Sequence, residues 1–313
     1  MEDKGNMTKT INSFVLLGFT TSRPIQVLLF FIFLFAYILT LVENTLVIVI
    51  VWTSSKLHKP MYFFLGHLSF LELWYINVIV PKLLLIFLIE SRHISLIGCI
   101  FQLYFFLFLG CTECAMLAVM AFDRYVAVCH PLRYVTIMNQ HFCIVLVSGS
   151  WLTGLCISLI KIYFISCLSF CRSGHINHFY CDVSPILNLS CTDMRMAELV
   201  DFVLALFILL APLLLTSFSY FCILVTILRI PTSSGRKKAF STCASHLAVV
   251  VIFYAAILFM YARPSRAQSF NSNKLVSVFY TVITPLLNPI IYCLRNKDFK
   301  KALLKLVYSK DGF

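Results

Sequence analysis

The sequence predicts an all-α membrane protein: a bundle of seven transmembrane helices followed by a short amphipathic C-terminal helix. Two features of composition predict this fold. The chain is 60% hydrophobic with only 12% of its 313 residues charged, and its mean hydropathy is +0.92. So few charges cannot cover the surface of a water-soluble fold of this length, so lipid is the expected solvent.

A third observation is the pattern of apolar segments, seven of which are long enough to cross a bilayer. Each is expected to be a helix, because a helix satisfies all of its backbone hydrogen bonds inside lipid. Pro81 and Pro212 fall inside two of the segments, where neighbouring helices can satisfy the freed carbonyl groups. The predicted spans are 25–52, 60–88, 98–129, 141–164, 197–229, 238–262 and 272–294.

The spans divide the chain into an N-terminal tail (1–24), a seven-span domain (25–294) and a C-terminal tail (295–313). The N-terminal tail lacks the basic start and short apolar core of a cleaved signal peptide, so the first span is expected to direct insertion. In the C-terminal tail, lysines alternate with apolar residues at helical spacing. This pattern predicts an amphipathic helix lying on membrane lipid. The apolar positions are Phe299, Leu303, Leu306 and Val307.

Charge and glycosylation sequons predict the orientation. With the N-terminus outside, the inner segments hold 14 Lys and Arg residues and the outer segments hold nine, which agrees with the positive-inside rule. Asn6 and Asn188 each begin an N-x-S/T sequon, and both sequons then lie outside, where glycosylation occurs. The net charge of +12 is accounted for by the inner loops, and with no nucleic-acid-binding module recognised we expect no nucleic acid partner.

Four of the 13 cysteines lie in the outer loop 165–196, and a fifth, Cys99, begins the third span. This side of the membrane is oxidising, so disulfides are expected to hold the loop over the mouth of the bundle. The spacing of the cysteines leaves their connectivity open. The loop cysteines are Cys167, Cys171, Cys181 and Cys191.

Three acids, Glu43, Glu72 and Glu113, lie inside apolar spans. Intramembrane acids are costly and are candidates for functional roles. Glu113 and Arg124 are eleven residues apart, about three helical turns, and so share the face of the third span that is expected to point inward. Glu72 and Glu113 are predicted to meet near mid-membrane, where the carboxyl groups either share a cation or are protonated and hydrogen-bonded.

Other classes of protein are less well supported. The chain has no HExxH, GxSxG or phosphate-binding loop, so we predict no catalytic residue, no cofactor and no enzyme. The CxxC spacing of Cys111 and Cys114 lies inside a membrane helix and lacks the redox context of that motif. An ion-coupled transporter would also place acids at mid-membrane, but no inverted repeat is visible.

A metal cluster of His175, His178, Cys171 and Cys181 is a further alternative. Disulfide use of these cysteines is favoured, and no metal site is predicted. A weaker form of the metal-site alternative stays open. In this form, residues 178–182 bind a soft metal that assists the binding of a thiol ligand.

Several motifs, in order and at the right spacing, resemble one family. HKPMYFFLGHLSFLE (58–72) resembles PMYFFLxxLSxxD, and MAFDRYVAVCHPLRY (120–134) resembles MAYDRYVAICxPLxY. SY (219–220), KAFSTCASH (238–246) and PLLNPIIYCLRN (285–296) match further motifs of the same family. The chain is therefore similar to the vertebrate olfactory receptors, of the rhodopsin-like class of G-protein-coupled receptors. In this pattern Glu72 replaces the usual Asp and Glu43 the usual Gly.

The resemblance implies an odorant receptor at the plasma membrane of olfactory neuron cilia. Such a receptor binds small, mostly apolar volatile molecules and activates a stimulatory olfactory-type G protein, which raises cyclic AMP. It also implies the disulfides Cys99–Cys181 and Cys171–Cys191. The alternative is a rhodopsin-like chemosensory receptor for a metabolite in another tissue.

The resemblance further implies an activation switch at the inner end of the bundle. At rest, Asp123 holds Arg124, and on activation Arg124 turns toward Tyr220 and Tyr292. The implied switch residues are Asp123, Arg124, Tyr125, Tyr220, Asn288, Pro289 and Tyr292.

The odorant pocket is implied between the third, fifth, sixth and seventh spans. Its walls are mostly apolar with a few polar groups, which favours neutral, largely apolar ligands. Phe106 stands where receptors for charged amines carry an acid. The implied lining residues are Leu103, Phe106, Leu107, Gly110, Cys111, Leu204, Ile208, Tyr254, Ile257, Leu258, Tyr261 and Thr281.

Overall fold

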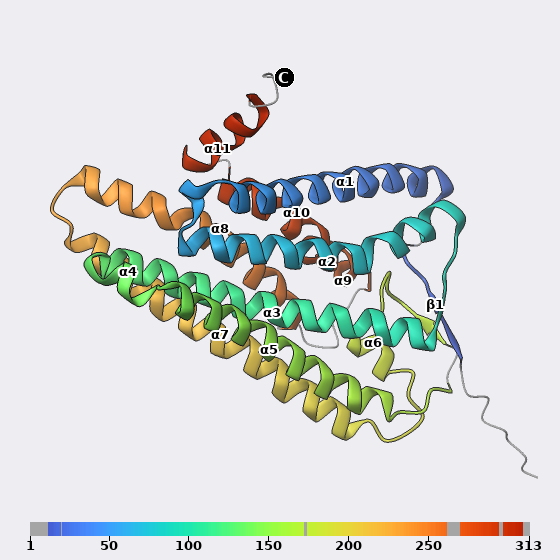
Figure 1. Cartoon of the computed structure of the whole chain (residues 1–313). Coiled ribbons are helices and arrows are strands. Elements are labelled where there is room, and N and C mark those ends of the chain that lie inside the picture. The colour runs from blue at the N-terminus through green and yellow to red at the C-terminus, as the bar shows by residue number, and fades with distance from the viewer. Residues whose placement is uncertain (1–11, 20, 172–173, 262–269, 294–296, 309–313) are drawn as a thin grey trace, which may run out of the picture.

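The computed structural model describes residues 12–19, 21–171, 174–261, 270–293 and 297–308. Long helices run side by side along one axis (Figure 1). They are α1 (Arg23–Thr53), α2 (Pro60–Ile89), α3 (Leu96–Cys129), α5 (Gln140–Ser166), α7 (Arg195–Arg229) and α8 (Ser233–Tyr261), and the seventh is built from α9 (Phe270–Val278), η4 (Phe279–Ile283) and α10 (Thr284–Cys293).

These helices confirm the predicted fold class. Six of them are each long and apolar enough to cross a membrane, and α8 qualifies as a pair of segments, Ser233–Ser241 and Cys243–Ile257, bent by 45°. The helix starts follow local signals. Pro24 and Pro60 lie in the first turns of α1 and α2, where a missing N–H costs nothing. Ser95 and Asn139 cap α3 and α5 by accepting backbone hydrogen bonds, as N-cap residues do.

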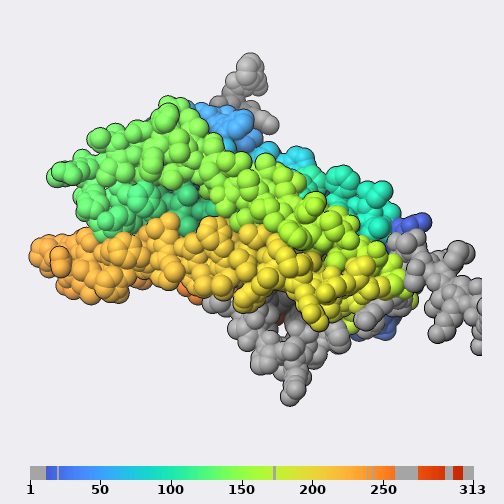
Figure 2. All heavy atoms as spheres, turned by 90° about the horizontal axis from the view of Figure 1, so that it is seen from below, coloured from blue at the N-terminus to red at the C-terminus, as the bar shows by residue number. Residues whose placement is uncertain are grey.

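The third helix is the centre of the bundle. In α3, 61% of the most apolar stretch is buried, against 17% in α1 and in α7, and α3 packs against α2, α5 and α7. Large apolar side chains such as Phe35, Trp52 and Phe218 point outward, as expected for a lipid-facing surface. Figure 2 shows the face on which α5 and α7 lie side by side.

A glycine allows α5 to approach α3 closely. A Cβ atom at Gly154 would lie 2.1 Å from Thr112 Oγ1 and 2.7 Å from the carbonyl oxygen of Phe108. Both distances are shorter than any real Cβ contact, so no larger residue fits here without moving one of the helices.

Short elements join the long helices. At the end of the bundle near Arg124 these are η1 (Ser55–Leu57), η2 (Pro131–Arg133) and α4 (Tyr134–Ile137). The predicted C-terminal helix is α11 (Lys297–Tyr308), which contacts α1 and η1. Phe299 and Leu303 lie on its packed side, whereas the side chains of Leu306 and Val307 are outside the described part of the chain.

The opposite end carries a small sheet that the sequence analysis did not anticipate. Strand β1 (Ser13–Leu16) lies between β2 (His93–Ser95), which is antiparallel to it, and β3 (His175–Ile176), which is parallel. Phe14 and Leu16 of β1 are fully buried. Part of the predicted N-terminal tail is therefore an ordered strand.

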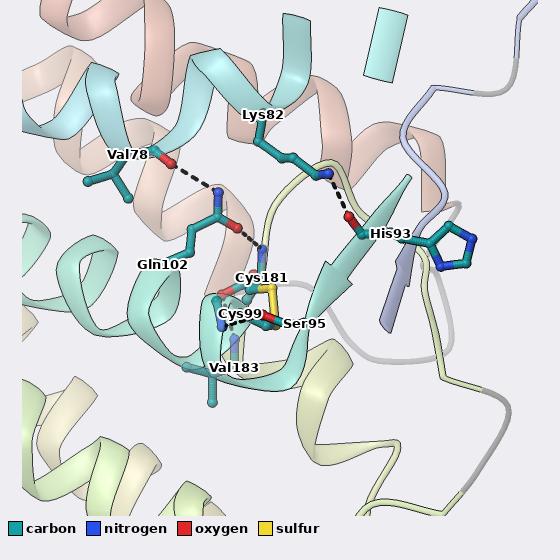
Figure 3. Close-up of a disulfide and its surroundings, with 10 residues drawn as sticks. Val78, Lys82, His93, Ser95, Cys99, Gln102, Cys181 and Val183 are labelled. Atoms are coloured by element: carbon teal, nitrogen blue, oxygen red, sulfur yellow. Dashed lines mark hydrogen bonds between the residues drawn. A yellow bond between two sulfur atoms is a disulfide. The ribbon is translucent and has the colours of Figure 1, made fainter. Parts of the chain in front are cut away.

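Two disulfides hold the loop after α5 beside this sheet. Cys99 is joined to Cys181 and Cys171 to Cys191, the pairing that the resemblance implied, whereas Cys167 is exposed and unpaired. Gln102 fixes the first bridge (Figure 3), because its amide donates to the Val78 carbonyl oxygen and accepts from Cys181 N, each at 3.0 Å. We call β1, β2 and residues 167–171 and 174–194, which include β3 and α6 (Val183–Leu187), the cap.

Candidate functional site

A cavity of about 560 Å³ lies beneath the cap, between α2, α3, α5, α7, α8 and the seventh helix. Most of its wall is apolar, and its size suits a small organic molecule. The predicted residues that line it are Phe106, Leu107, Gly110, Cys111, Ile208 and Ile257.

Other predicted lining residues lie elsewhere. Leu103 is fully buried in the apolar cluster beneath the cap, and Leu204 and Tyr254 pack in the main core. Thr281 turns inward and donates to the Ser277 carbonyl oxygen at 2.7 Å, since a threonine hydroxyl often bonds back to its own helix. The side chains of Leu258 and Tyr261 lie outside the described part of the chain.

The cavity wall contains an ion pair that is not predicted from the sequence. Lys161 Nζ of α5 lies 2.8 Å from Asp201 Oδ1 of α7, and both residues line the cavity. The two side chains are only 4% and 22% exposed. A lysine inside the fourth apolar span could have indicated this pair, because charged residues within membrane spans usually pair with an opposite charge.

The cap supplies further polar groups to the cavity, namely His175, His178 and Asp182. Burial raises the pKa of the Asp182 carboxyl to about 6, although it accepts a hydrogen bond from the backbone N–H of Val183. Burial and, second, the charge of Lys274 lower the pKa of His178 to about 3. Desolvation disfavours the charged form in both cases.

One of the intramembrane acids, Glu72, contacts the seventh helix. Asn288 donates to Glu72 Oε1, and Asn44 of α1 donates to the Pro285 carbonyl oxygen at 3.2 Å. Glu113 is buried and lines the floor of the cavity. Among the described residues, Glu72 Oε2 and Glu113 Oε1 have no hydrogen-bond partner. Glu113 therefore lies at the cavity, whereas Glu72 joins α2 to α10.

At the other end of α3, Arg124 is held by its neighbour in the sequence. Arg124 Nη2 and Nε lie 2.5 and 3.1 Å from Asp123 Oδ2, and both residues are buried. Asp123 Oδ1 accepts a hydrogen bond of 2.7 Å from the hydroxyl of Tyr134. Burial and then the nearby Asp123 charge raise the pKa of Tyr134. Tyr134 ends the motif at 120–134, but the motif does not reveal that Tyr134 is a partner of Asp123.

The remaining switch residues have other surroundings. The Tyr220 hydroxyl bonds to His246 Nδ1 at 2.6 Å, a partner that the sequence analysis did not name. The buried Tyr292 hydroxyl has no partner among the described residues. Tyr125 bonds instead to His130 at 3.1 Å, and Pro289 lies within α10.

The structure removes Cys181 as a metal-binding side chain from the proposed soft-metal site, because Cys181 is bonded to Cys99. No group of three or more metal-binding side chains occurs among the described residues. Asn188, the second sequon, is exposed at the end of α6, and Asn6 lies outside the described residues.

Comparisons with known proteins agree with this architecture. A profile of the family described as "Olfactory receptor" matches residues 33–310. Olfactory receptor 6B1 of Homo sapiens is 59% identical over 97% of this chain and 97% of its own length. Olfactory receptor 226 of Rattus norvegicus is 56% identical over 98% of this chain and 95% of its own.

A solved structure with the same fold is squid rhodopsin. The TM-score is 0.72 at 15% identity, covering 92% of this chain and 82% of that chain, which shows a shared fold only. Family membership is shown by the profile match and by the relatives that align over nearly the full length. This chain is a multi-pass membrane receptor, not an enzyme, and it belongs to the olfactory receptor family of G-protein-coupled receptors.

Proposed function

We propose that this protein is an odorant receptor that binds small, mostly apolar volatile molecules beneath the cap. Binding activates a stimulatory olfactory-type G protein and raises cyclic AMP. The observation that carries the proposal is that α3 joins both parts: Phe106, Gly110 and Glu113 line the cavity, and the Asp123–Arg124 pair ends the same helix.

The walls of the cavity support a neutral ligand with one polar group. Apolar side chains supply most of the contact surface, and the Lys161–Asp201 pair presents a dipole whose charges compensate each other. A ligand with a full charge would disturb this pair and would lose its own hydration. A small molecule with a hydroxyl or carbonyl group keeps a hydrogen bond without that cost.

The proposal places the cap outside the cell and the Asp123–Arg124 pair against the G protein. This orientation is supported by the excess of Lys and Arg in the segments on the Arg124 side and by the disulfides on the opposite side, which form in oxidising compartments. Arg124, released from Asp123, is then the group that meets the G protein. The location in olfactory neuron cilia is part of the same proposal.

Ligand binding in the cavity is tested by a substitution that fills part of the cavity with a side chain. Gly110 lines the cavity, and a Cβ atom there would meet nothing within 4 Å, so Gly110→Leu has room to fold while occupying ligand space. We expect this variant to reach the surface and to lose the cyclic AMP response to an odorant panel. Gly149→Leu is the matched control, since Gly149 is exposed on α5 and also has open space. Equal responses from both variants would contradict binding in this cavity.

A further inference from the structure

Two walls of the cavity are joined by hydrogen bonds that no motif indicates. His178 comes from the cap and Tyr280 from the seventh helix, and both line the cavity. Ser277 lies between them: its Oγ is 3.2 Å from His178 Nε2 and accepts from the Tyr280 hydroxyl at 3.3 Å. The Tyr280 hydroxyl is also hydrogen-bonded to that of Tyr180.

The same helix is tied to the N-terminal segment. Lys274 Nζ donates to the Gly18 carbonyl oxygen at 2.6 Å, and Gly18 N donates to the His178 carbonyl oxygen at 3.1 Å. Gly18 has φ +59°, and a Cβ there would lie 3.0 Å from Ile86, so glycine suits this position. We call Gly18, His178, Lys274, Ser277 and Tyr280 the latch, because they join three segments that are distant in the sequence.

One ring nitrogen of His178 is available to bind a ligand. It is 4% exposed, and its Nδ1 has no hydrogen-bond partner among the described residues. A neutral imidazole carries one donor and one acceptor, and a buried nitrogen without a partner is costly. A ligand hydroxyl, which both donates and accepts, matches this nitrogen in either tautomer and also matches the Tyr280 hydroxyl.

Tyr280 lies in the π-helical stretch η4 of the seventh helix. Here the Thr284 N–H bonds to the Phe279 carbonyl oxygen five residues earlier, and Thr284 Oγ1 donates to the same oxygen at 3.0 Å. Single π turns carry one extra residue and occur frequently at functional sites. Relaxing this turn to α-helical geometry would rotate the helix below it, which holds the Asn288–Glu72 hydrogen bond.

We propose that Tyr280 and His178 form the polar contact site for an alcohol ligand in this cavity, and that occupation of the site releases the latch and frees the seventh helix. The ligand hydroxyl bonds to Nδ1 of His178 and to the Tyr280 hydroxyl. There it competes with the bonds that Tyr280 makes to Ser277 and to Tyr180 of the cap. The π turn then loses the tie to the cap that Tyr280 provides. This proposal rests on the proposed function and names the ligand class and the helix that responds.

The first test needs no ligand. Cyclic AMP is measured in cells that express the full chain with a stimulatory G protein, normalised to surface staining. Tyr280→Phe removes the tie to Tyr180 and Ser277→Ala removes the tie to His178. Each variant is expected to raise basal cyclic AMP about 2- to 10-fold, the change in a two-state equilibrium that one net hydrogen bond produces. Tyr37→Phe is the matched control, because it removes a 2.7 Å hydrogen bond to Asn77 outside the cavity.

The second test measures binding without a G protein. Thermal unfolding of the purified receptor is followed with n-octanol and with n-octane, which has the same length but no hydroxyl. We expect n-octanol to raise the unfolding temperature more than n-octane in the wild type and in Tyr37→Phe, and the difference to vanish in Tyr280→Phe. Equal shifts from both probes in the wild type would overturn the alcohol site.

The two tests separate the latch from the proposed function. Basal cyclic AMP in Tyr280→Phe that matches Tyr37→Phe would overturn the release of the seventh helix. If the wild type signals no more than Arg124→Ala with either probe, the proposed coupling to the G protein fails, and the thermal shifts still decide the alcohol site.

Discussion

At one end of the bundle Arg124 is held by the adjacent Asp123, whereas at the other end Lys274 is held by Gly18, 256 residues away. The Arg124 end depends on short-range contacts within α3 and the turn that follows it. The cap depends on two disulfides, a three-stranded sheet and hydrogen bonds between distant segments. The first arrangement rests on few side chains and suits a switch. In the second, the disulfides and the sheet fix the roof of the cavity, and the latch hydrogen bonds are the part that the proposed ligand releases.

The largest expected effect comes from opening the cap. Cys99→Ser removes the bridge that closes a separation of 82 residues, and loss of a native disulfide typically costs about 2–5 kcal/mol. We expect little receptor at the cell surface and a lower unfolding temperature. Cys167→Ser, at an exposed free cysteine, is the control and should behave as wild type. Normal delivery of Cys99→Ser would show that the sheet and the second disulfide are enough to hold the cap.

The second prediction concerns the close packing of α5 against α3, the helix that runs between the two ends. Gly154→Ala forces a Cβ atom against Thr112 and Phe108, and overpacking of this kind typically costs about 1–3 kcal/mol. Gly149→Ala, with nothing within 4 Å, should be neutral. Unfolding temperatures of the two purified variants provide the measurement, and equal temperatures would mean that α5 shifts freely along α3.

The third prediction concerns a single hydrogen bond that supports Asp123 at the Arg124 end. Tyr134→Phe removes the 2.7 Å bond to Asp123, worth about 0.5–1.5 kcal/mol. Asp123 then holds Arg124 with less support, so basal cyclic AMP per surface receptor should rise a few-fold. Tyr163→Phe, at a 66% exposed tyrosine of α5, is the control. A fall in basal signalling would mean that Tyr134 supports the active form instead.

The smallest expected effect is the response of the cap to pH. His178 has a pKa of about 3 in the fold, below its ordinary value of 6.5, so the unfolded chain binds more protons below about pH 6.5. Its contribution to stability is complete above that pH and is lost as the pH falls toward the folded value. Asp182, with a pKa raised to about 6, acts in the opposite sense because the folded form gains the proton first.

The variant His178→Asn isolates this effect. Between about pH 7.5 and about pH 5, the unfolding temperature of the wild type should fall relative to that of the variant, since only the wild type loses the histidine contribution. Parallel curves for the two proteins would contradict a neutral buried His178.

The Arg124 end could be predicted from the sequence better than the cap, because its contacts are between residues close together in the chain. The seven spans follow from hydropathy, and Asp123 and Arg124 stand in a contiguous motif, so the pattern near them is local. The strand Ser13–Leu16 could not be predicted, because its partners are short segments far away in the chain. The same holds for the pairing of Lys161 with Asp201 and of His178 with Ser277.

The cavity lining was predicted in part. Residues one helical turn apart on α3, such as Phe106 and Gly110, line the cavity as predicted, because one face of a helix can be read from the sequence. Thr281 is predicted in the wall, but it is fully buried and donates to the carbonyl oxygen of Ser277 in its own helix. It lies in the π turn at Phe279–Ile283. Helical spacing does not reveal such a turn.

The central claim is that a ligand beneath the cap acts through Arg124. The most direct test is cyclic AMP in cells that express this chain with a stimulatory olfactory-type G protein, screened against an odorant panel with surface staining in parallel. We predict a dose-dependent rise in the wild type that is absent in Arg124→Ala at equal surface density. An undiminished response in Arg124→Ala would contradict the account.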